Sequence, residues 1–413
     1  MRRPAWLGGP GKDADGAVLL TGPGAGELLK TAVEHAGGDL IDWHLDHVDT
    51  NPGQSTTATY QAWVQWPAGR RQELFGMSAR ASGPVVTDSR ADIYVDGSRE
   101  VAVWRYPDDP DLPGLSRAAY PEHMAAIISD LDLVGARVSA QQINLRMIGY
   151  RPRRRAVLCV EVSNRRFYVK VLRDGIFQAT LARHDLLTRA SVPSPTVAGV
   201  TEDNLLFLTE LPGCPLSKAL FELGTPCTAE SLVDLLDQLP PQVCDLPRRS
   251  PWSESVDHYC RMVAAALPDQ SERLERMAQT ITQGLADVPA GNEPTHGDFH
   301  EGQIHVWNGQ VCGILDVDTI GPGRRADDLA CLVAHLSTVQ RMNAFQADRM
   351  RQILTAWVPV FDSRVDPIEL RLRSAAVAIS LATGPYRSQE DNGQAETIST
   401  VDPGAAVIDA VLS

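Results

Sequence analysis

The sequence predicts an α+β protein in which a strand-rich first part is followed by a mostly helical second part. Residues 40–104 contain alternating apolar and polar runs, which are typical of antiparallel strands, after a short helix expected at 26–35. Six later segments repeat apolar residues at helical spacing. They span 228–239, 253–267, 271–285, 327–341, 346–360 and 366–381. We therefore expect a small antiparallel α+β unit first and a helical lobe last.

The segment between these parts is predicted to hold a second small sheet. Strands are expected at 144–149, 156–162, 167–172 and 205–209, with a helix at 176–190 between the last two. A connector rich in Pro and Asp, 106–114, is expected to follow an extended path, and a helix follows at 121–131. Near the C-terminus we expect a polar loop at 384–404 and a last short helix.

Composition limits the classes of partner. The chain has 413 residues and a formal net charge of -14, which argues against a general binder of nucleic acid or anionic membranes and favours small-molecule partners. No apolar run is long enough to cross a membrane. The arginine pair at 2–3 lacks the apolar region that a twin-arginine signal needs, so we expect a cytoplasmic protein.

An Asn-Gly pair at 308–309 joins two short apolar runs, 304–307 and 311–317, and is the strongest short-range signal for a β-hairpin. A tight antiparallel turn returns the outer ends of its strands to one place. One outer end carries Asp298 and Gln303, and the other carries two more aspartates. The sequence thus predicts an acidic site at the open end of this hairpin.

The residues at this open end fit phosphoryl transfer. That reaction needs an Asp facing the attacking hydroxyl, and oxygen ligands that hold Mg²⁺ against the phosphates. We expect Asp298 to orient the acceptor hydroxyl and accept its proton, and Gln303 and Asp316 to hold magnesium. Asp318 is equally well suited to two roles, binding a second metal ion and capping the next turn. Asp328 is expected to cap or brace the helix that follows.

Other metal centres fit the sequence less well. His296 and His300 have the i, i+4 spacing of zinc ligands on a helix, but Gly297 follows the first and the pattern downstream is that of a strand. The seven cysteines lie between Cys159 and Cys331 without CxxC spacing. They fit reduced, mostly buried thiols better than disulfides or a zinc site.

Lys170 is the strongest candidate for a nucleotide contact outside the hairpin. It lies in a predicted strand with Tyr168 and Leu172 on its own face, so a solvated edge charge fits it poorly. The basic turn around Arg153 is able to offer guanidinium and backbone N–H groups to phosphates. A solvated hairpin tip explains that turn equally well.

The stretch from His296 to Gln303, His-Gly-Asp-Phe-His-Glu-Gly-Gln, resembles the catalytic motif of aminoglycoside phosphotransferase-like kinases. In that family an Asn usually stands where this chain has Gln303, and the Gln form resembles the maltokinase and glucosamine kinase branch. With Lys170 and the later strand, the resemblance covers roughly residues 140–340. It implies a bilobal protein-kinase-like fold, with an N-terminal antiparallel α+β cap, a small β-rich nucleotide lobe and a mostly helical C-lobe.

The resemblance also implies boundaries and nucleotide contacts. It places the cap in residues 1–105, the nucleotide-binding lobe in 106–210 and the helical lobe with the catalytic and metal motifs in 211–413. Lys170 matches the strand lysine that holds nucleotide phosphates in kinases. Backbone groups around Thr209 and Leu211 would bind the adenine edge at a hinge, although a strand ending in Pro-Gly is by itself an ordinary loop entry.

One departure from the family pattern concerns the partner of Lys170. The helix after such a lysine normally supplies a Glu, but residues 176–190 contain none. Either Gln178 or Asp185 replaces it, or another group holds Lys170. The sequence therefore predicts an ATP- and magnesium-dependent phosphotransferase for a hydroxyl of a small polar molecule, with a sugar or aminosugar favoured. The alternatives are an antibiotic or amino-alcohol phosphotransferase, and a nucleotide-binding pseudokinase with a regulatory role.

Overall fold

The computed structural model describes residues 13–51, 53–83, 85, 90–96, 99–222, 224–338 and 343–383. The chain divides into two units, which are described separately. The first comprises Met1–Gln178 with Val197–Glu210, and the second comprises Ala179–Thr196 with Leu211–Ser413. The arginine pair at 2–3, the loop predicted at 384–404 and the last short helix lie outside the described residues. The three-part boundaries at 105 and 210 stay a prediction.

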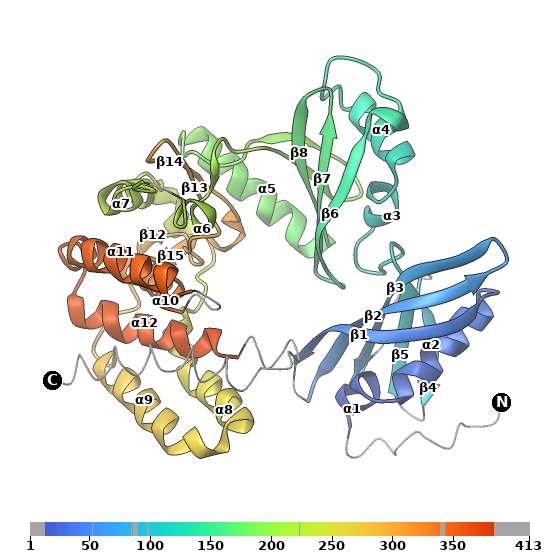
Figure 1. Cartoon of the computed structure of the whole chain (residues 1–413), viewed down its shortest axis with the longest axis horizontal. Helices are drawn as coiled ribbons and strands as arrows, with labels where there is room; N and C mark the ends of the chain where they lie inside the picture. The colour runs from blue at the N-terminus through green and yellow to red at the C-terminus, as the bar shows by residue number, and fades with distance from the viewer. Residues whose placement is uncertain are drawn as a thin grey trace. The chain divides into compact units, whose positions relative to one another are not determined.

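A five-stranded antiparallel sheet opens the first unit, in the order β1-β2-β3-β5-β4 (Figure 1). Its strands are β1 (Asp39–Asn51), β2 (Ser55–Trp66), β3 (Gly69–Arg80), β4 (Asp92–Asp96) and β5 (Arg99–Arg105). Alternate residues such as Tyr60 and Met77 are fully buried against the apolar face of α2 (Gly24–His35), and α1 (Ala17–Thr21) joins the same core. The α+β unit expected at the start of the chain is confirmed.

A second five-stranded antiparallel sheet completes the first unit, in the order β6-β7-β8-β10-β9. Its strands are β6 (Asn144–Arg151), β7 (Arg155–Val162), β8 (Arg165–Leu172), β9 (Val197–Val200) and β10 (Leu205–Thr209). Figure 1 shows α3 (Leu115–Ala118) and α4 (Pro121–Asp130) along one face, where Ile128, Val169 and Phe207 share a core. The long helix α5 (Asp174–Arg189) follows β8.

The connector at 106–114 differs from the extended path that its prolines predicted. It forms a succession of turns, and Asp109 within it is fully buried. The reason is a set of hydrogen bonds to the Asp109 carboxylate, from the Tyr150 hydroxyl and from the backbone N–H groups of Asp111 and Arg153. A carboxylate that accepts several hydrogen bonds is stable away from water. Burial of Asp109 therefore makes the connector turn inward instead of running extended.

Helices dominate the second unit, as predicted. The longer ones are α7 (Ala229–Asp237), α8 (Val256–Ala266), α9 (Ser271–Gly284), α10 (Arg325–Ser337), α11 (Ala344–Asp362) and α12 (Pro367–Leu381), and α6 (Leu216–Ala219) is a single turn. Thr228, Asn343 and Asp366 cap α7, α11 and α12 by accepting a backbone N–H. The main core gathers side chains of α7, α10 and α11 around the hairpin at 304–314, including Phe299, Ile304 and Phe361.

Two small sheets in the second unit position the predicted site. The hairpin strands β13 (Ile304–Trp307) and β14 (Gln310–Ile314) pair with β11 (Cys214–Pro215), and β12 (Glu293–Thr295) pairs with β15 (Gly321–Gly323). The predicted Asn-Gly turn is confirmed, because Asn308 and Gly309 both have positive φ. The second strand ends earlier than predicted, because Asp316 has a left-handed backbone (φ 48°) that interrupts a strand.

The structure also bears on the expectations for the cysteines and for membrane-spanning segments. All seven cysteines are free thiols. Among the described residues, no helix combines the length and the apolar character needed to cross a membrane.

Candidate active site

A buried carboxylate on α10 anchors the loop that carries Asp298. Asp328 accepts hydrogen bonds from the backbone N–H groups of His296 and Gly297, at 2.8 Å each. Burial raises the pKa of Asp328, while His296 and the two N–H donors oppose that shift. Asp328 therefore braces the preceding loop rather than its own helix, where Asp327 accepts the N-terminal Arg324 N–H instead. Charge-assisted hydrogen bonds of this kind fix backbone geometry strongly.

Gly297 and His296 tie the same loop to the residues that follow the hairpin. Gly297 has a φ of 78°, and a Cβ there would lie 2.7 Å from the Thr319 carbonyl oxygen, so only glycine fits. The Nε2 atom of His296 lies 2.9 Å from the carbonyl oxygen of Leu315, and the Thr319 hydroxyl donates to the His296 carbonyl. Hydrogen bonds with Asp328, Leu315 and Thr319 thus fix the backbone that precedes Asp298.

The open end of the hairpin places Gln303 beside the strand that leads to Asp316. The Leu315 N–H donates to the Gln303 carbonyl at 2.7 Å, directly beyond the paired residues Ile304 and Ile314. The left-handed backbone of Asp316 then turns the chain into a short 3-10 helix, Val317–Thr319. Sequence reasoning predicted this proximity from the tight turn alone.

The His300 imidazole contacts one of the predicted site residues and feels the charge of two others. Its Nε2 atom lies 3.2 Å from the side-chain nitrogen of Gln303. Burial lowers the pKa of His300, but a hydrogen bond with Glu301 and the negative charges of Glu301, Asp298 and Asp316 outweigh burial and raise the pKa above the ordinary value. A carboxylate pair with an amide oxygen is a donor set that suits a hard divalent cation such as Mg²⁺.

The carboxylate of Asp298 keeps its oxygens available. Within the described part of the chain, no hydrogen bond or ion pair to it is found, and the side chain is half-buried. The neighbouring Phe299 is fully buried and holds the loop in place. Asp318 lies in the 3-10 turn after Asp316 and is also half-buried. Its role as a second metal ligand stays a prediction.

His300, Glu301 and His335 form a compact group that the sequence analysis did not anticipate. The two imidazole rings stack with centroids 4.4 Å apart and planes 10° apart. One Glu301 oxygen lies 3.7 Å from Nδ1 of His300 and 3.5 Å from Nδ1 of His335. Burial favours a high pKa for Glu301, but the two imidazoles hold that pKa below its usual value. Burial lowers the pKa of His335. His335 comes from α10, so no local pattern indicated it.

Lys170 and Thr209 lie in the second sheet of the first unit. Lys170 is only 7% exposed, in the middle of β8, where it pairs with Val157 on one side and Leu206 on the other. Thr209 ends β10 opposite Phe167 and is half-buried. Leu211 belongs to the second unit and is buried. The predicted face of β8 is confirmed, since Phe167, Val169 and Val171 all face the core.

Arg153 occupies a buried position in the first unit. Its side chain is 8% exposed, and its guanidinium donates to Asp111 at 3.0 Å and to the Ser78 hydroxyl at 2.9 Å. Its backbone N–H donates to Asp109. These contacts engage the side chain within the fold, and its predicted part in phosphate binding stays a prediction.

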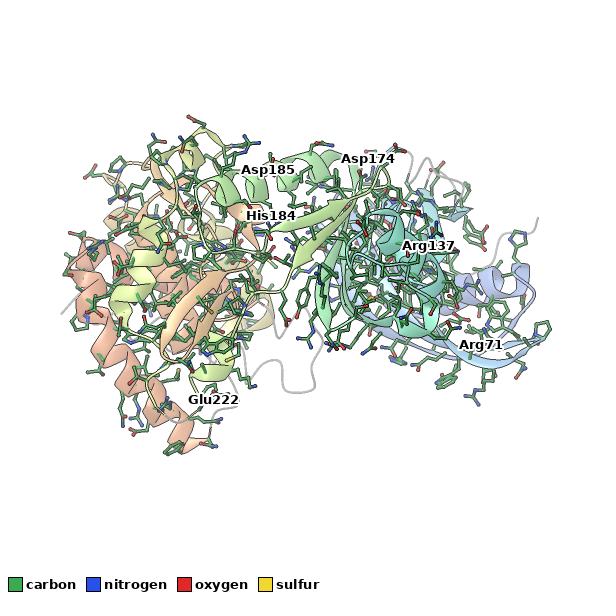
Figure 2. The ribbon with its side chains drawn as sticks, turned by 90° about the horizontal axis from the view of Figure 1, so that it is seen from above. Arg71, Arg137, Asp174, His184, Asp185 and Glu222 are labelled. Atoms are coloured by element: carbon green, nitrogen blue, oxygen red, sulfur yellow. The ribbon has the colours of Figure 1, made fainter. Side chains whose placement is uncertain are left out.

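The two candidate replacements for the missing Glu lie on the surface of α5. Gln178 is exposed, and Asp185 pairs with Arg189 at 3.3 Å. Figure 2 labels Asp185 beside His184 toward the end of the helix and Asp174 at its start. Asp174 accepts a hydrogen bond from Asn204 at 2.5 Å, which ties α5 to the strand β10 that follows.

A pocket lies beside the loop that begins at Gly297. Polar and aromatic side chains of the second unit line it, among them Trp252, Thr319 and Asp327. Burial raises the pKa of Asp327 to about 6, although Arg373 donates to it at 2.5 Å.

The sequence model of a phosphotransferase enzyme family, abbreviated APH, matches residues 151–360 of this chain. That range is slightly more than half of the 413 residues and contains Lys170, Asp298, Gln303 and Asp316. The chain belongs to this family. The predicted enzyme class, a phosphotransferase, is confirmed, and the two-part α+β fold agrees with it.

Several solved structures are similar to this phosphotransferase. Choline kinase LicA from Streptococcus pneumoniae shares 11% identity, with a TM-score of 0.45, and the match covers 70% of this chain and 99% of that one. ADP-bound aminoglycoside phosphotransferase APH(2'')-Ib shares 14%, with a TM-score of 0.43, covering 65% and 95%. Because these scores are low, the assignment rests on the family model. No curated protein matches the phosphotransferase in sequence.

Proposed function

We propose that this protein is an ATP- and Mg²⁺-dependent kinase that phosphorylates a hydroxyl group of a small polar molecule, with a sugar or aminosugar as the favoured acceptor. The observation that carries the proposal is the grouping made by hydrogen bonds that hold the Asp298 loop and Gln303 against the residues on either side of Asp316. Family membership supplies the phosphoryl chemistry, and this grouping supplies the residues for it. A base beside a hard-cation site is what phosphoryl transfer requires.

In the proposed reaction, the acceptor oxygen bonds to the γ-phosphorus of ATP as the bond to the β-bridging oxygen breaks, and ADP leaves. Asp298 orients the hydroxyl and takes its proton. Gln303 and Asp316 would hold Mg²⁺, with Asp318 as a candidate for a second ion. Bound Mg²⁺ would neutralise charge on the phosphates.

Nucleotide binding is proposed for the residues expected from sequence. Lys170 would contact the phosphates, and backbone groups around Thr209 and Leu211 would bind the adenine edge. Support for Arg153 is weaker, because its guanidinium already bonds to Asp111 and Ser78. A phosphate contact by that side chain would have to replace these bonds.

The acceptor is proposed to approach Asp298 from the side of the narrow cavity beside Gly297, which by itself has room for little more than water. The indole of Trp252 and the hydroxyl and carboxylate groups around this cavity are the groups proposed to contact a polyhydroxylated ring there. Gln303 in place of the usual Asn favours the sugar kinase branch. Antibiotic and amino-alcohol acceptors are the alternatives, and a pseudokinase is the rival from another class.

The test is ADP release with ATP and Mg²⁺ against sugars, aminosugars, aminoglycosides and amino alcohols. We expect one acceptor class to stimulate ADP release in wild type and no acceptor to do so in Asp298→Asn. Stimulation by an aminoglycoside or choline alone would replace the sugar assignment. Nucleotide binding without turnover on any acceptor would favour the pseudokinase.

A further inference from the structure

We propose that a groove in the first unit is a binding site for a neutral saccharide, separate from the candidate active site. The groove lies between the outer face of the first sheet, opposite α2, and strand β6 of the second sheet, and has a volume of about 410 Å³. Sites for small molecules typically have about 300–1,000 Å³. All of its lining residues belong to the first unit, so the proposal goes beyond the proposed kinase function and does not depend on it.

A chain of hydrogen-bonded side chains forms the floor of the groove. Gln72 on β3 donates to the amide oxygen of Gln61 at 2.8 Å, and Gln61 on β2 donates to Asp46 at 2.8 Å. The Thr59 hydroxyl donates to the second Asp46 oxygen at 3.1 Å. A carboxylate accepts hydrogen bonds and donates none, so Asp46 fixes which end of each amide is the donor. The unused donors and acceptors of the floor therefore have fixed places.

A β-bulge in β1 places Asp46 over this floor. The register between β1 and β2 shifts between Leu45 and His47, so Asp46 is the extra residue. Bulges commonly re-aim a side chain. Here the bulge lets one carboxylate reach both Thr59 and Gln61 on the adjacent strand. The sheet is thus irregular at the residue that orders the polar floor.

Strand β6 supplies the opposite wall of the groove and holds it in place. Met147, Gly149 and Tyr150 line this side. The Tyr150 hydroxyl donates to Asp109 and accepts from the Trp104 indole of the first sheet. These bonds link the two sheets beside the groove, so its walls are ordered before a ligand binds.

The polar groups of the floor match neighbouring hydroxyl groups of a sugar. A hydroxyl donates one hydrogen bond and accepts others, so a row of hydroxyls needs donors and acceptors side by side. Beyond the bonds within the floor, Gln72 and Gln61 each keep a second side-chain N–H, and Asp46 keeps further lone pairs. No arginine or lysine is among the described residues that line the groove, so it suits an anionic ligand poorly.

An exposed indole flanks the same floor. Trp63 follows Gln61 on the outer face of β2 and lies opposite Gln72 on β3. It is 37% exposed, and the guanidinium of Arg70 lies over one face of the ring at 4.8 Å from its centre. Arg70 lies beyond Gln72, on the side away from the groove. The other face of the ring is offered to a ligand, and stacking the apolar C–H face of a sugar on it would remove apolar surface from water.

The competing interpretation is an ordinary solvated sheet face with cross-strand pairs, which occur on any open antiparallel sheet. Two features oppose it. Thr59 points to this outer face and is only 2% exposed, so the face is covered there. A Cβ at Gly149 would meet no atom within 4 Å, so the space beside this wall is open and not packed. A covered but unfilled polar face is typical of a binding site.

The first test measures saccharide binding to the full chain without nucleotide, by isothermal titration calorimetry. The probes are maltotriose, cellotriose and mannotriose, with spermidine as a cationic probe. We expect at least one trisaccharide to bind. Gly149→Phe should weaken that binding at least about tenfold, because its ring would fill the open space that the ligand needs. Gly175→Phe, at an exposed glycine of the same unit that also has open space around its Cβ, is the matched control and should bind as wild type does.

The second test removes single contacts from the floor. Gln61→Ala should weaken trisaccharide binding about tenfold, because it removes the amide that links Gln72 to Asp46. Trp63→Ala should weaken it about threefold to tenfold. Gln65→Ala is the matched control, since this glutamine is exposed on the same strand but does not line the groove, and should stay within about twofold of wild type.

Hydrogen–deuterium exchange locates the bound saccharide. We expect protection of segments 55–80 and 144–151 in wild type, and loss of this protection in Gly149→Phe. Urea unfolding shows which variants are folded, and if Gly149→Phe is not, Gln61→Ala and Trp63→Ala decide. The proposal is overturned if no trisaccharide binds, or if binding persists unchanged in the folded groove variants. Spermidine binding that these variants lose, without saccharide binding, would show a cation site instead. None of these outcomes bears on turnover at Asp298.

Discussion

In each unit, a buried aspartate accepts backbone hydrogen bonds from a turn. The two turns differ in whether the side chain that they carry is itself bonded. Asp328 accepts two backbone N–H groups of the loop that carries Asp298, and Asp109 accepts the backbone N–H of Arg153. In the second unit, no hydrogen bond or ion pair to the Asp298 carboxylate is found among the described residues, although its charge acts on His300. In the first unit, the Arg153 side chain is engaged by Asp111 and Ser78.

We expect this difference to separate a position that reacts from one that supports the fold. A rigid backbone with an available side chain is pre-organised for a ligand, and its polar group is stable because water reaches it. A rigid backbone with a fully bonded, buried side chain gains stability, and a ligand would have to compete with those bonds. On this comparison, changes near Asp298 should affect turnover, whereas changes near Arg153 should affect folding.

The largest contrast is expected between two aspartates of the site. Asp316→Ala should lower kcat by at least about 10²-fold, since it removes a charge that would hold Mg²⁺ beside Gln303. Asp318→Ala should cost less, because Asp316 directly follows Leu315, whose N–H is bonded to Gln303, whereas Asp318 lies two residues further along the 3-10 turn. Initial rates at saturating ATP, titrated with Mg²⁺, check both. A larger loss of kcat in Asp318→Ala than in Asp316→Ala would show that Asp318, and not Asp316, is the main magnesium ligand.

A second contrast compares the two basic candidates of the first unit. Arg153→Met should lower the free energy of unfolding by on the order of 2 kcal/mol, because it breaks a largely buried pair whose partner, Asp111, is 33% exposed. Lys170→Met should raise the KM for ATP at least about tenfold. Urea denaturation and steady-state kinetics on both variants separate these effects. If Arg153→Met raises the KM for ATP as strongly as Lys170→Met, the supporting role of Arg153 is wrong.

Tyr150 tests how much the buried network around Asp109 stabilises the first unit. The Tyr150 hydroxyl donates to Asp109 at 2.7 Å and accepts from the Trp104 indole at 2.9 Å. Tyr150→Phe should therefore lower the free energy of unfolding by about 1–2 kcal/mol. Tyr120→Phe, at an exposed position, is the control and should change it by less than about 0.5 kcal/mol. Equal changes in the free energy of unfolding for the two variants would show that the hydrogen bonds around Asp109 do not stabilise the first unit.

The smallest effect is expected at the surface of α5. Asp185 pairs only with exposed Arg189 in the contacts found for it, at 3.3 Å. Asp185→Asn should keep kcat/KM for ATP within about twofold of wild type, because an exposed i, i+4 pair contributes little. A tenfold loss would instead identify Asp185 as the replacement for the missing helix glutamate.

The local parts of the site were predictable from sequence. The Asn-Gly turn fixes a hairpin by itself, and the hairpin fixes the proximity of Gln303 and Asp316. The helices and most strands followed from periodicity. Boundaries were less certain where one residue adopts an unusual backbone, as Asp316 does at the end of β14.

The parts that were not predictable depend on residues distant in the chain. His335 reaches His300 from α10, and the partners of Arg153 come from β3 and the 106–114 connector. The extended path expected for that connector was wrong because burial of Asp109 outweighs the preference of its prolines. Proline preferences describe local backbone alone, whereas the hydrogen bonds to Asp109 arise only in the folded unit.

Asp298 is the residue on which the proposed reaction depends most directly. The decisive measurement is kcat for Asp298→Asn at saturating ATP, Mg²⁺ and acceptor, together with the Kd for ATP of the same variant. We predict that kcat falls by about 10³-fold or more while the Kd stays within about threefold, because the carboxylate acts on the acceptor proton and not on the nucleotide. Unchanged turnover would contradict the catalytic assignment.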